Sequence, residues 1–177
     1  MILDIVEYPD KRLRLKSQDV KNFDENLHTL LDNMYETMID QSGIGLAAIQ
    51  VAKPLKALII NLPNEEDEQS KEDLLEIINP VIIEKEGEVF YQEGCLSVPN
   101  FYEDIQRYKS IKINYQDRFG NTNTLEADDL LSIAIQHEMD HLDGKLFIDK
   151  LSYARRKKFE KEYKKFLRER KQKLKAK

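Results

Sequence analysis

The chain has 177 residues, of which 41% are hydrophobic and 34% are charged. This length is typical of one domain, and the hydrophobic content suffices for a buried core, which excludes a chain disordered over most of its length. The longest apolar stretches, such as residues 57–60, fall far short of the roughly 20 residues of a membrane-spanning helix. The N-terminus lacks the basic start of a secretory signal. The single cysteine, Cys95, cannot form an internal disulfide. These features predict a cytoplasmic protein with no membrane partner.

The net charge of −5 combines two very different segments. Residues 152–177 contain thirteen Lys/Arg and three Asp/Glu, a net charge of +10, whereas residues 1–151 contain fifteen basic and thirty acidic residues, a net charge of −15. We therefore expect one acidic globular domain over residues 1–151, followed by a basic C-terminal helix or tail over residues 152–177.

The first half of the chain predicts a surface turn, one helix and two strands. The turn follows Pro9, and an amphipathic helix is expected over residues 24–40, where leucines and methionines recur at helical spacing. Residues 42–45 then end the helix. Strands are expected over residues 55–61 and 77–84, and Pro80 within the second indicates an edge or a bulge. The segment between the strands is an acidic, solvated loop.

The second half of the chain predicts a hairpin and two further helices. Residues 111–115 and 122–127 alternate around a turn and read as paired strands. A helix over about 128–142 is apolar nearly all round, which is typical of a buried helix. A basic helix covers residues 152–173. Helices and antiparallel strands come in separate runs, so we predict an α+β fold: antiparallel or mixed sheets packed around the central buried helix, with a C-terminal helix added.

The predicted buried helix carries the sequence His137-Glu138-Met139-Asp140-His141. The spacing of four residues places both imidazoles on one helix face, where they can bind one metal ion. Glu138 lies beside them and can accept a proton from water that the metal activates. Two imidazoles and a carboxylate without partners would be costly in a buried helix. The motif therefore predicts a metal site.

A catalytic metal site needs a third protein ligand. The candidates are Cys95, whose thiolate suits a transition metal, His28, and the acidic residues Glu160 and Glu162. His28 lies within the first amphipathic helix and reads better as an ordinary boundary histidine. Glu160 or Glu162 would make the protein a zinc protease, although their segment is strongly basic. A further alternative is a non-catalytic RNA-binding protein with a structural metal, for which no fourth ligand is evident.

A third segment, Gly43-Ile44-Gly45-Leu46-Ala47-Ala48-Ile49-Gln50, combines two glycines with a terminal amide. The glycines allow the backbone to approach a ligand, and Gln50 offers an amide donor. The segment lacks both the third glycine of the dinucleotide-binding motif and a Gly-Lys-Ser/Thr sequence, so a phosphate-binding loop is excluded.

Together, three segments resemble the motifs of the peptide deformylase family in their order and spacing. They are residues 43–50, Glu93-Gly94-Cys95-Leu96-Ser97, and Gln136-His137-Glu138-Met139-Asp140-His141. Residues 8–14 resemble the N-terminal signature of that family and residues 78–80 its central strand, so the resemblance reaches to about residue 150. It implies that residues 1–151 form a catalytic metallohydrolase domain. Its activity would be removal of the formyl group from the N-terminal formyl-methionine of newly synthesised polypeptides, with release of formate.

The resemblance implies a role for each motif residue. Cys95, His137 and His141 would bind one divalent metal ion per chain, with Fe²⁺ expected physiologically and Zn²⁺ or Ni²⁺ also compatible. Glu138 would transfer protons, while the Gln50 side chain and the Leu96 backbone N–H would stabilise the negative charge on the formyl oxygen. The backbone at Ile44 and Gly45 would pair with the substrate like an added strand. The methionine pocket would contain Ile44, Leu130 and Ile133, with Glu93 at its rim.

Two positions depart from the pattern of the resembled family. Tyr102 occupies a position, seven residues after the cysteine, at which many bacterial members have Arg, and Lys11 stands where many have Pro. The family is also known to contact the ribosome through a C-terminal helix. The basic residues 152–177 therefore predict binding to ribosomal RNA, driven by counterion release; the alternative is a solvated helix docked on the acidic body.

Overall fold

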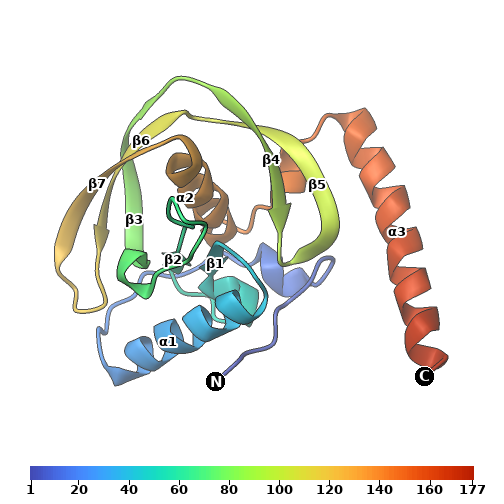
Figure 1. Cartoon of the computed structure of the whole chain (residues 1–177), viewed down its shortest axis with the longest axis horizontal. Helices are drawn as coiled ribbons and strands as arrows, with labels where there is room; N and C mark the ends of the chain where they lie inside the picture. The colour runs from blue at the N-terminus through green and yellow to red at the C-terminus, as the bar shows by residue number, and fades with distance from the viewer.

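The computed structural model describes all 177 residues and contains two antiparallel sheets and three α-helices (Figure 1). The larger sheet has the strand order β1-β2-β3-β6-β7, and β4 pairs with β5 in the smaller one. The strands are β1 (Gly45–Ala47), β2 (Ala57–Ile60), β3 (Leu75–Glu86), β4 (Val89–Cys95), β5 (Val98–Arg107), β6 (Ser110–Gln116) and β7 (Thr122–Asp128). The helices are α1 (Glu25–Asp40), α2 (Asp129–Leu142) and α3 (Tyr153–Lys175).

This architecture confirms the predicted α+β class, with every pair of strands antiparallel. Figure 1 shows α2 in the middle of the molecule, between the strands β3, β6 and β7 on one side and the β4–β5 pair on the other. The helix that carries the two metal-site histidines is therefore enclosed by both sheets.

Strand β2 is buried on both faces because a different helix covers each face. Ala57 and Ile59 pack in one core cluster with α1, whereas Leu58 and Ile60 pack in a second cluster with α2. Successive side chains of a strand point to opposite faces, so the uninterrupted apolar run over residues 57–60 is what a strand between two helices requires. The same arrangement fixes β1, at the edge of the sheet, between the two helices.

The predicted bulge in the second strand is present. The pairing of β3 with β6 shifts register between Ile78 and Val81, and Asn79 has a φ of +50°. The Asn79 side chain donates to the carbonyl of Val20 and accepts from its N–H, both at 2.9 Å. Pro80 has no N–H to contribute to the ladder, so it is accommodated where the regular pairing is already broken.

The pair β4–β5 was not predicted. Most side chains of β4 are exposed, including Phe90 and Tyr91. Because this strand has no face that is consistently buried, the period-two alternation that marks a strand is missing from its sequence.

The C-terminal helix α3 is docked through its first half. Phe159 and Tyr163 are each 2% exposed, pack around Tyr8 and Phe101, and lie in one core cluster with them. The Tyr163 hydroxyl donates to the carbonyl of Tyr8 at 3.0 Å. Two aromatic residues of α3 therefore complete the core of the body, while most of its basic residues face solvent. None of the helices combines the length and apolar character that crossing a bilayer requires.

Candidate active site

A cavity of about 560 Å³ lies where β1, α2 and the β4–β5 pair meet. The residues predicted for metal binding, catalysis and the methionine pocket line this cavity, with the exception of His141. Its lining includes Ile44, Gly45, Gln50, Glu93, Cys95, Leu96, Leu130, Ile133, His137 and Glu138. Three motifs that lie far apart in the sequence therefore meet at one site.

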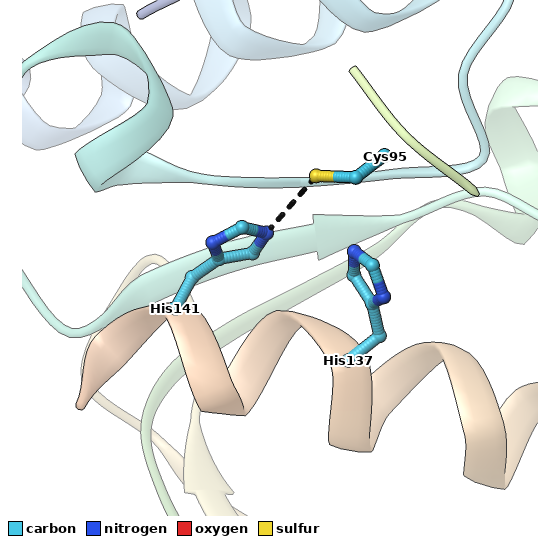
Figure 2. A group of neighbouring side chains, drawn as sticks. All are labelled: Cys95, His137 and His141. Atoms are coloured by element: carbon cyan, nitrogen blue, oxygen red, sulfur yellow. Dashed lines mark hydrogen bonds between the residues drawn. The ribbon is translucent and has the colours of Figure 1, made fainter. Parts of the chain in front are cut away.

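Cys95, His137 and His141 form the centre of the site. The Cys95 Sγ and one ring nitrogen from each histidine all lie within 4.8 Å of one another. Figure 2 shows the two imidazoles projecting from α2 toward the thiol at the end of β4, and the His141 Nε2 is 3.5 Å from the sulfur. The other third-ligand candidates lie elsewhere: His28 bonds to the carbonyl of Arg118, while Glu160 and Glu162 pair with basic residues of α3.

The chemistry of this cluster fits a divalent transition metal. A thiolate and two imidazoles are the ligands that such ions prefer. The buried Glu138 Oε2 and His141 Nδ1 have no hydrogen-bond partner in the protein, and a buried polar atom without a partner calls for an explanation. The two histidines shift in opposite directions. Burial opposes the charged form of His137, but the Cys95 sulfur and the Glu93 carboxylate hold its pKa well above the ordinary value, whereas burial and His137 hold the pKa of His141 well below it.

The carboxyl group of Glu138 lines the cavity and lies against Gly45 of β1. Burial raises the pKa of Glu138 to about 7, although the neighbouring His137 opposes this shift. A carboxyl with this pKa can both accept and release a proton near neutral pH. A Cβ added to Gly45 would lie 2.8 Å from the Glu138 Oε1. The glycine therefore provides the space that the carboxyl group occupies.

The amide of Gln50 is held in one orientation. The Ala47 backbone N–H donates to its Oε1 at 2.9 Å, which requires the amide oxygen to face that side. The Nε2 then points toward the β4–β5 turn, 3.0 Å from the Ser97 Oγ and 3.6 Å from the Cys95 Sγ. The Gln50 N–H groups are thus directed at the centre of the site.

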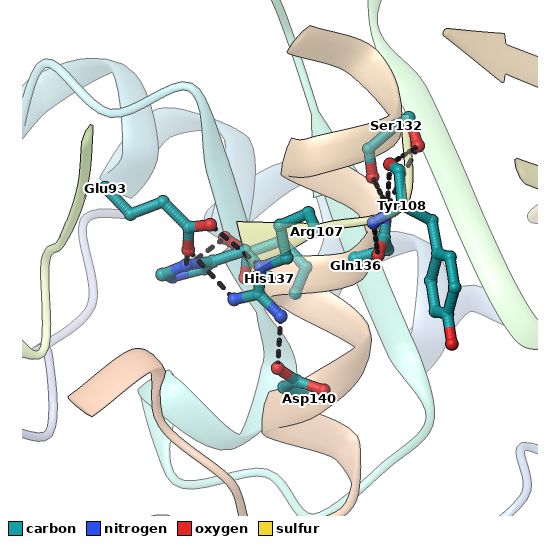
Figure 3. A network of polar contacts seen from close by, with 8 residues as sticks. Glu93, Arg107, Tyr108, Ser132, Gln136, His137 and Asp140 are labelled. Carbon is teal, nitrogen blue, oxygen red and sulfur yellow. Dashed lines mark hydrogen bonds and ion pairs between the residues drawn. The ribbon is translucent and has the colours of Figure 1, made fainter. Parts of the chain in front are cut away.

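A chain of ion pairs holds the His137 ring through its Nδ1 atom (Figure 3). The His137 Nδ1 is 2.7 Å from the Glu93 Oε1, and Arg107 binds both oxygens of the Glu93 carboxylate. Arg107 also donates to Asp140 at 2.6 Å. Burial alone would raise the pKa of Glu93, but its bonds to Arg107 and His137 lower it below the ordinary value. Glu93 is therefore an anion that fixes the orientation of the His137 ring.

A second set of contacts in Figure 3 fixes α2 against the end of β5. The Gln136 side chain accepts from the N–H of Tyr108 at 3.0 Å and donates to its carbonyl at 2.8 Å. The Ser132 hydroxyl donates to the same carbonyl at 2.9 Å. Both backbone polar groups of Tyr108 are therefore bonded to α2, and a movement of the helix along the strand would break all three hydrogen bonds.

Glu93 lines the same cavity as Ile44, Leu130 and Ile133, the residues proposed for the methionine pocket. Its side chain is only 4% exposed, and its carboxylate faces His137 and Arg107. Tyr102 covers Gly94 across the β4–β5 pair, since a Cβ added to this glycine would lie 2.6 Å from the Tyr102 ring.

Arg107, Asp140 and Ser97 were not identified from the sequence. Asp140 lies inside the histidine motif, where its position could have suggested a role. Arg107 lies twelve residues beyond Cys95 in an unpredicted strand, and no local pattern marks it. Its role depends on contacts with β4 and α2 that only the tertiary structure reveals.

Comparisons with a family model, with known protein sequences and with solved structures all point to the same family. The family model for polypeptide deformylase matches residues 2–157. The peptide deformylase of Helicobacter pylori strain J99 is 58% identical over 97% of this chain and 99% of the relative, and that of Nautilia profundicola is 53% identical over the same shares. The crystal structure of a peptide deformylase from Legionella pneumophila superposes with a TM-score of 0.88 at 38% identity, covering 96% of this chain and 98% of that one.

The match extends over nearly the whole chain, and the fold and the donor cluster agree with it. The chain therefore belongs to the polypeptide deformylase family, the metal-dependent hydrolases that remove the N-formyl group from formyl-methionine peptides.

Proposed function

We propose that Cys95, His137 and His141 bind the metal ion of this deformylase and that Glu138, Gln50 and Leu96 carry out the chemistry around it. The observation that carries this proposal is the convergence of the three donor atoms within 4.8 Å at a cavity that also contains the Glu138 carboxyl. When bound, the ion supplies a Lewis acid that activates water and polarises the formyl oxygen.

Glu138 transfers the proton in both halves of the reaction. Its carboxylate accepts a proton from the attacking water, whose oxygen bonds to the formyl carbon. The same carboxyl then donates that proton to the amine nitrogen as the C–N bond breaks, which leaves formate and a free N-terminal amine. Burial raises the pKa of Glu138, which favours a carboxyl that can donate a proton as well as accept one.

Negative charge builds up on the formyl oxygen as water attacks, and two N–H donors stabilise it. The Gln50 Nε2 is directed toward the site by the bond between its Oε1 and Ala47. The Leu96 backbone N–H has no acceptor within the protein, which leaves it available to the substrate. Losing one such donor typically costs about 10²–10³ in rate.

The substrate main chain binds along the free edge of β1, at Ile44 and Gly45. β1 pairs only with β2, so its other edge is open toward the cavity. Ile44, Leu130 and Ile133 provide apolar surface for the methionine side chain. Recognition through main-chain hydrogen bonds lets one enzyme accept many N-terminal sequences.

The central test is deformylation by the Fe²⁺-loaded protein, prepared without oxygen. Formyl-Met-Ala-Ser is the substrate, and amine release is measured. We expect turnover by the wild-type protein and a loss of about 10²–10⁴ in kcat in Glu138→Gln, which keeps the size of the side chain but cannot accept the proton. Equal turnover by the two proteins would contradict the role of Glu138.

Metal content tests the ligand set separately. We expect Cys95→Ser to lose the metal or to bind it far more weakly, as measured by atomic absorption after gel filtration. Ser97→Ala, two residues away, should keep full metal occupancy. Fe²⁺ is the proposed physiological ion, with Zn²⁺ and Ni²⁺ as alternatives that the same ligands accept, and the proposed compartment is the cytoplasm, where nascent formyl-methionine chains emerge.

The proposed partner beyond the substrate is the ribosome, bound through the basic face of α3. The support is charge, since thirteen basic residues lie in residues 152–177. The variant must keep the buried Phe159 and Tyr163, so charges rather than the helix should be removed. Five exposed residues suit this purpose: Lys161, Lys164, Lys165, Arg168 and Lys171, each changed to Gln.

We expect this variant to keep its activity on free peptide and to lose salt-sensitive co-sedimentation with ribosomes. A control with five exposed body lysines changed to Gln should co-sediment normally: Lys11, Lys16, Lys21, Lys53 and Lys145. Equal co-sedimentation of the two variants would contradict binding through α3.

A further inference from the structure

The Gln50 amide, which is proposed to stabilise the charge on the formyl oxygen, is held at both of its ends. The Ala47 N–H donates to its Oε1 at 2.9 Å, and its Nε2 donates to the Ser97 Oγ at 3.0 Å. Gln50 is 1% exposed and Ser97 is fully buried. Both bonds are therefore shielded from water, where hydrogen bonds are electrostatically stronger than at the surface.

The two bonds fix different properties of the amide. The Ala47 N–H decides which end carries the oxygen, because a flipped amide would place its own N–H groups against that donor. This bond does not fix the tilt of the amide plane, since the terminal torsion of a glutamine side chain is broad. A second bond at the nitrogen removes this freedom, so Ser97 determines where the Nε2 hydrogens point.

The nitrogen of a glutamine side chain carries two hydrogens. The Ser97 oxygen accepts one of them, and the other is directed toward the Cys95 Sγ, 3.6 Å from the nitrogen. That sulfur belongs to the donor cluster proposed to bind the metal ion. The bond to Ser97 therefore leaves one hydrogen of the amide, and this hydrogen points at the proposed reaction centre.

Ser97 is itself held in place by the N-terminal segment of the chain. The Tyr8 N–H donates to the Ser97 carbonyl at 2.7 Å, and the Val6 N–H donates to the carbonyl of Gln50, also at 2.7 Å. Gln50 and Ser97 are therefore joined directly through their side chains and, by way of residues 6–8, through their main chains. A hydroxyl with such a fixed position can define the orientation of the amide that it binds.

We propose that Ser97 is a positioning residue: its hydroxyl fixes the plane of the Gln50 amide, so that the remaining Nε2 hydrogen faces the formyl oxygen as negative charge develops there. This inference rests on the proposed role of Gln50. The advantage is preorganisation, because a donor that is already oriented does not have to be ordered during the reaction. Without the hydroxyl the amide would still be present, but its hydrogens would be spread over a range of orientations.

The mobility of the Gln50 amide gives a test that does not depend on turnover. Nitrogen relaxation of the Nε2 is measured by NMR on the zinc-loaded protein, because zinc is diamagnetic. We expect an order parameter of about 0.85 in the wild-type protein, as in a rigid group, and one near or below about 0.6 in Ser97→Ala. Ser132→Ala removes an equally buried serine hydroxyl from α2 and should leave the Gln50 value unchanged. An unchanged value in Ser97→Ala, or an equal fall in Ser132→Ala, would overturn the inference.

Steady-state kinetics test the consequence for deformylation. We expect Ser97→Ala to lower kcat for formyl-Met-Ala-Ser about tenfold, which is less than the loss of about 10²–10³ that follows removal of a whole donor. The KM should stay within about twofold of the wild-type value, because the bond from Gln50 strengthens only as charge develops in the transition state. An unchanged kcat in Ser97→Ala, or a raised KM without a fall in kcat, would contradict the proposed role.

A double-mutant cycle separates an effect through Gln50 from a general loss of structure. In the Gln50→Ala background no amide remains to be positioned, so the further change Ser97→Ala should lower kcat by no more than about twofold. A second tenfold loss in that background would show that Ser97 acts elsewhere, and the inference would be wrong. Wild-type kcat in Gln50→Ala would instead contradict the proposed function of Gln50, and the order parameters would still decide whether Ser97 holds the amide.

Discussion

Arg107 binds both carboxylate oxygens of Glu93, at 2.8 and 2.9 Å, and both side chains are almost fully buried. This pair places the Glu93 Oε1 2.7 Å from the His137 Nδ1. A carboxylate in this position accepts the Nδ1 proton and leaves the Nε2 lone pair directed at the cluster. An arginine on β5, far from the histidine motif in sequence, therefore controls the tautomer of a proposed metal ligand.

Weakening the contact between Glu93 and His137 should lower the affinity of the site for its metal ion. In Glu93→Gln, the neutral amide holds the His137 proton less strongly, and we expect metal affinity to fall about 10–100-fold. Competition with a chromophoric chelator for zinc measures this change. Glu88→Gln removes an exposed carboxylate from the segment just before β4 and should leave the affinity unchanged. Equal affinities of Glu93→Gln and the wild-type protein would show that the contact does not act on the metal.

Removing the Arg107 side chain should lower the free energy of unfolding. Arg107→Met leaves Glu93 and Asp140 without their buried cation, and breaking a buried pair in this way typically costs about 3–5 kcal/mol. Urea denaturation of the metal-loaded protein measures the free energy of unfolding. The double variant Arg107→Met/Glu93→Gln should recover part of the loss, because the unpaired charge on Glu93 is then absent. A double variant less stable than Arg107→Met would contradict this explanation.

A methyl group on Gly45 should impair catalysis without affecting the metal. The added Cβ would lie 2.8 Å from the Glu138 Oε1 and would displace the carboxyl from its position. We expect Gly45→Ala to lose about 10² or more in kcat, within the range of general acid–base catalysis, and to keep its metal content. Gly120→Ala, in the β6–β7 turn, offers a control for general glycine effects on folding. Normal kcat in Gly45→Ala would contradict the close packing.

Acid stability should depend on Asp149, which joins the N-terminal segment to α3. Burial would raise the pKa of Asp149, but bonds from Arg14, Leu146 and Arg156 lower it below the ordinary value. A lowered pKa means that its contribution to stability is complete above about pH 4, the unfolded value, and is lost as the pH falls through the folded pKa.

Asp149→Asn should therefore be less stable than wild type at pH 7, and the difference should shrink toward pH 3. Thermal unfolding midpoints over this range provide the measurement, with the exposed Asp143→Asn as the control. A difference that stays constant with pH would show that ionisation of Asp149 is not responsible.

The cavity should disfavour acidic substrates. Its lining contains Glu7, Glu93 and Glu138 but no lysine or arginine, and the exposed Tyr102 ring is also part of the lining. We expect Tyr102→Arg to raise kcat/KM for formyl-Met-Ala-Asp relative to formyl-Met-Ala-Ser about two- to fivefold, as a surface ion pair allows. The gain should disappear at high salt, and Tyr102→Phe should show none. An equal change for both peptides would exclude a charge effect.

The sequence predicted the elements that have a buried face. The helix over residues 128–142 and the strand at 57–60 were recognised because their apolar residues are so numerous that each element must be buried on more than one side. The metal cluster followed from the spacing of His137 and His141, which is local information. Cys95 remained one of several candidates until the resemblance to a family was considered.

The remaining features depend on contacts between distant segments. Strand β4 has most of its side chains in solvent, so the alternation that would mark it is missing, although Val89, Phe90 and Tyr91 are residue types that favour strands. Arg107 and Ser97 have roles defined by groups that lie 14 and 47 residues away. The docking of α3 depends on Tyr8, more than 150 residues away. The proposed boundary at residue 151 stays a prediction, and the burial of Phe159 and Tyr163 shows that the two parts share a core.

The apolar run of β2 has a consequence for how the sheet finds its alignment. Both faces of residues 57–60 are hydrophobic, so a slip by one position would bury the same kind of surface on each side. Burial alone therefore does not choose between the alternatives. The alignment depends instead on the segments that flank the strand, where the Lys56 backbone N–H donates to the carbonyl of Gln18 and the Asn61 backbone N–H donates to the carbonyl of Ile44. Because Ile60 pairs with Gly45, which leaves the space for the Glu138 carboxyl, the alignment of β2 also sets the surroundings of that group.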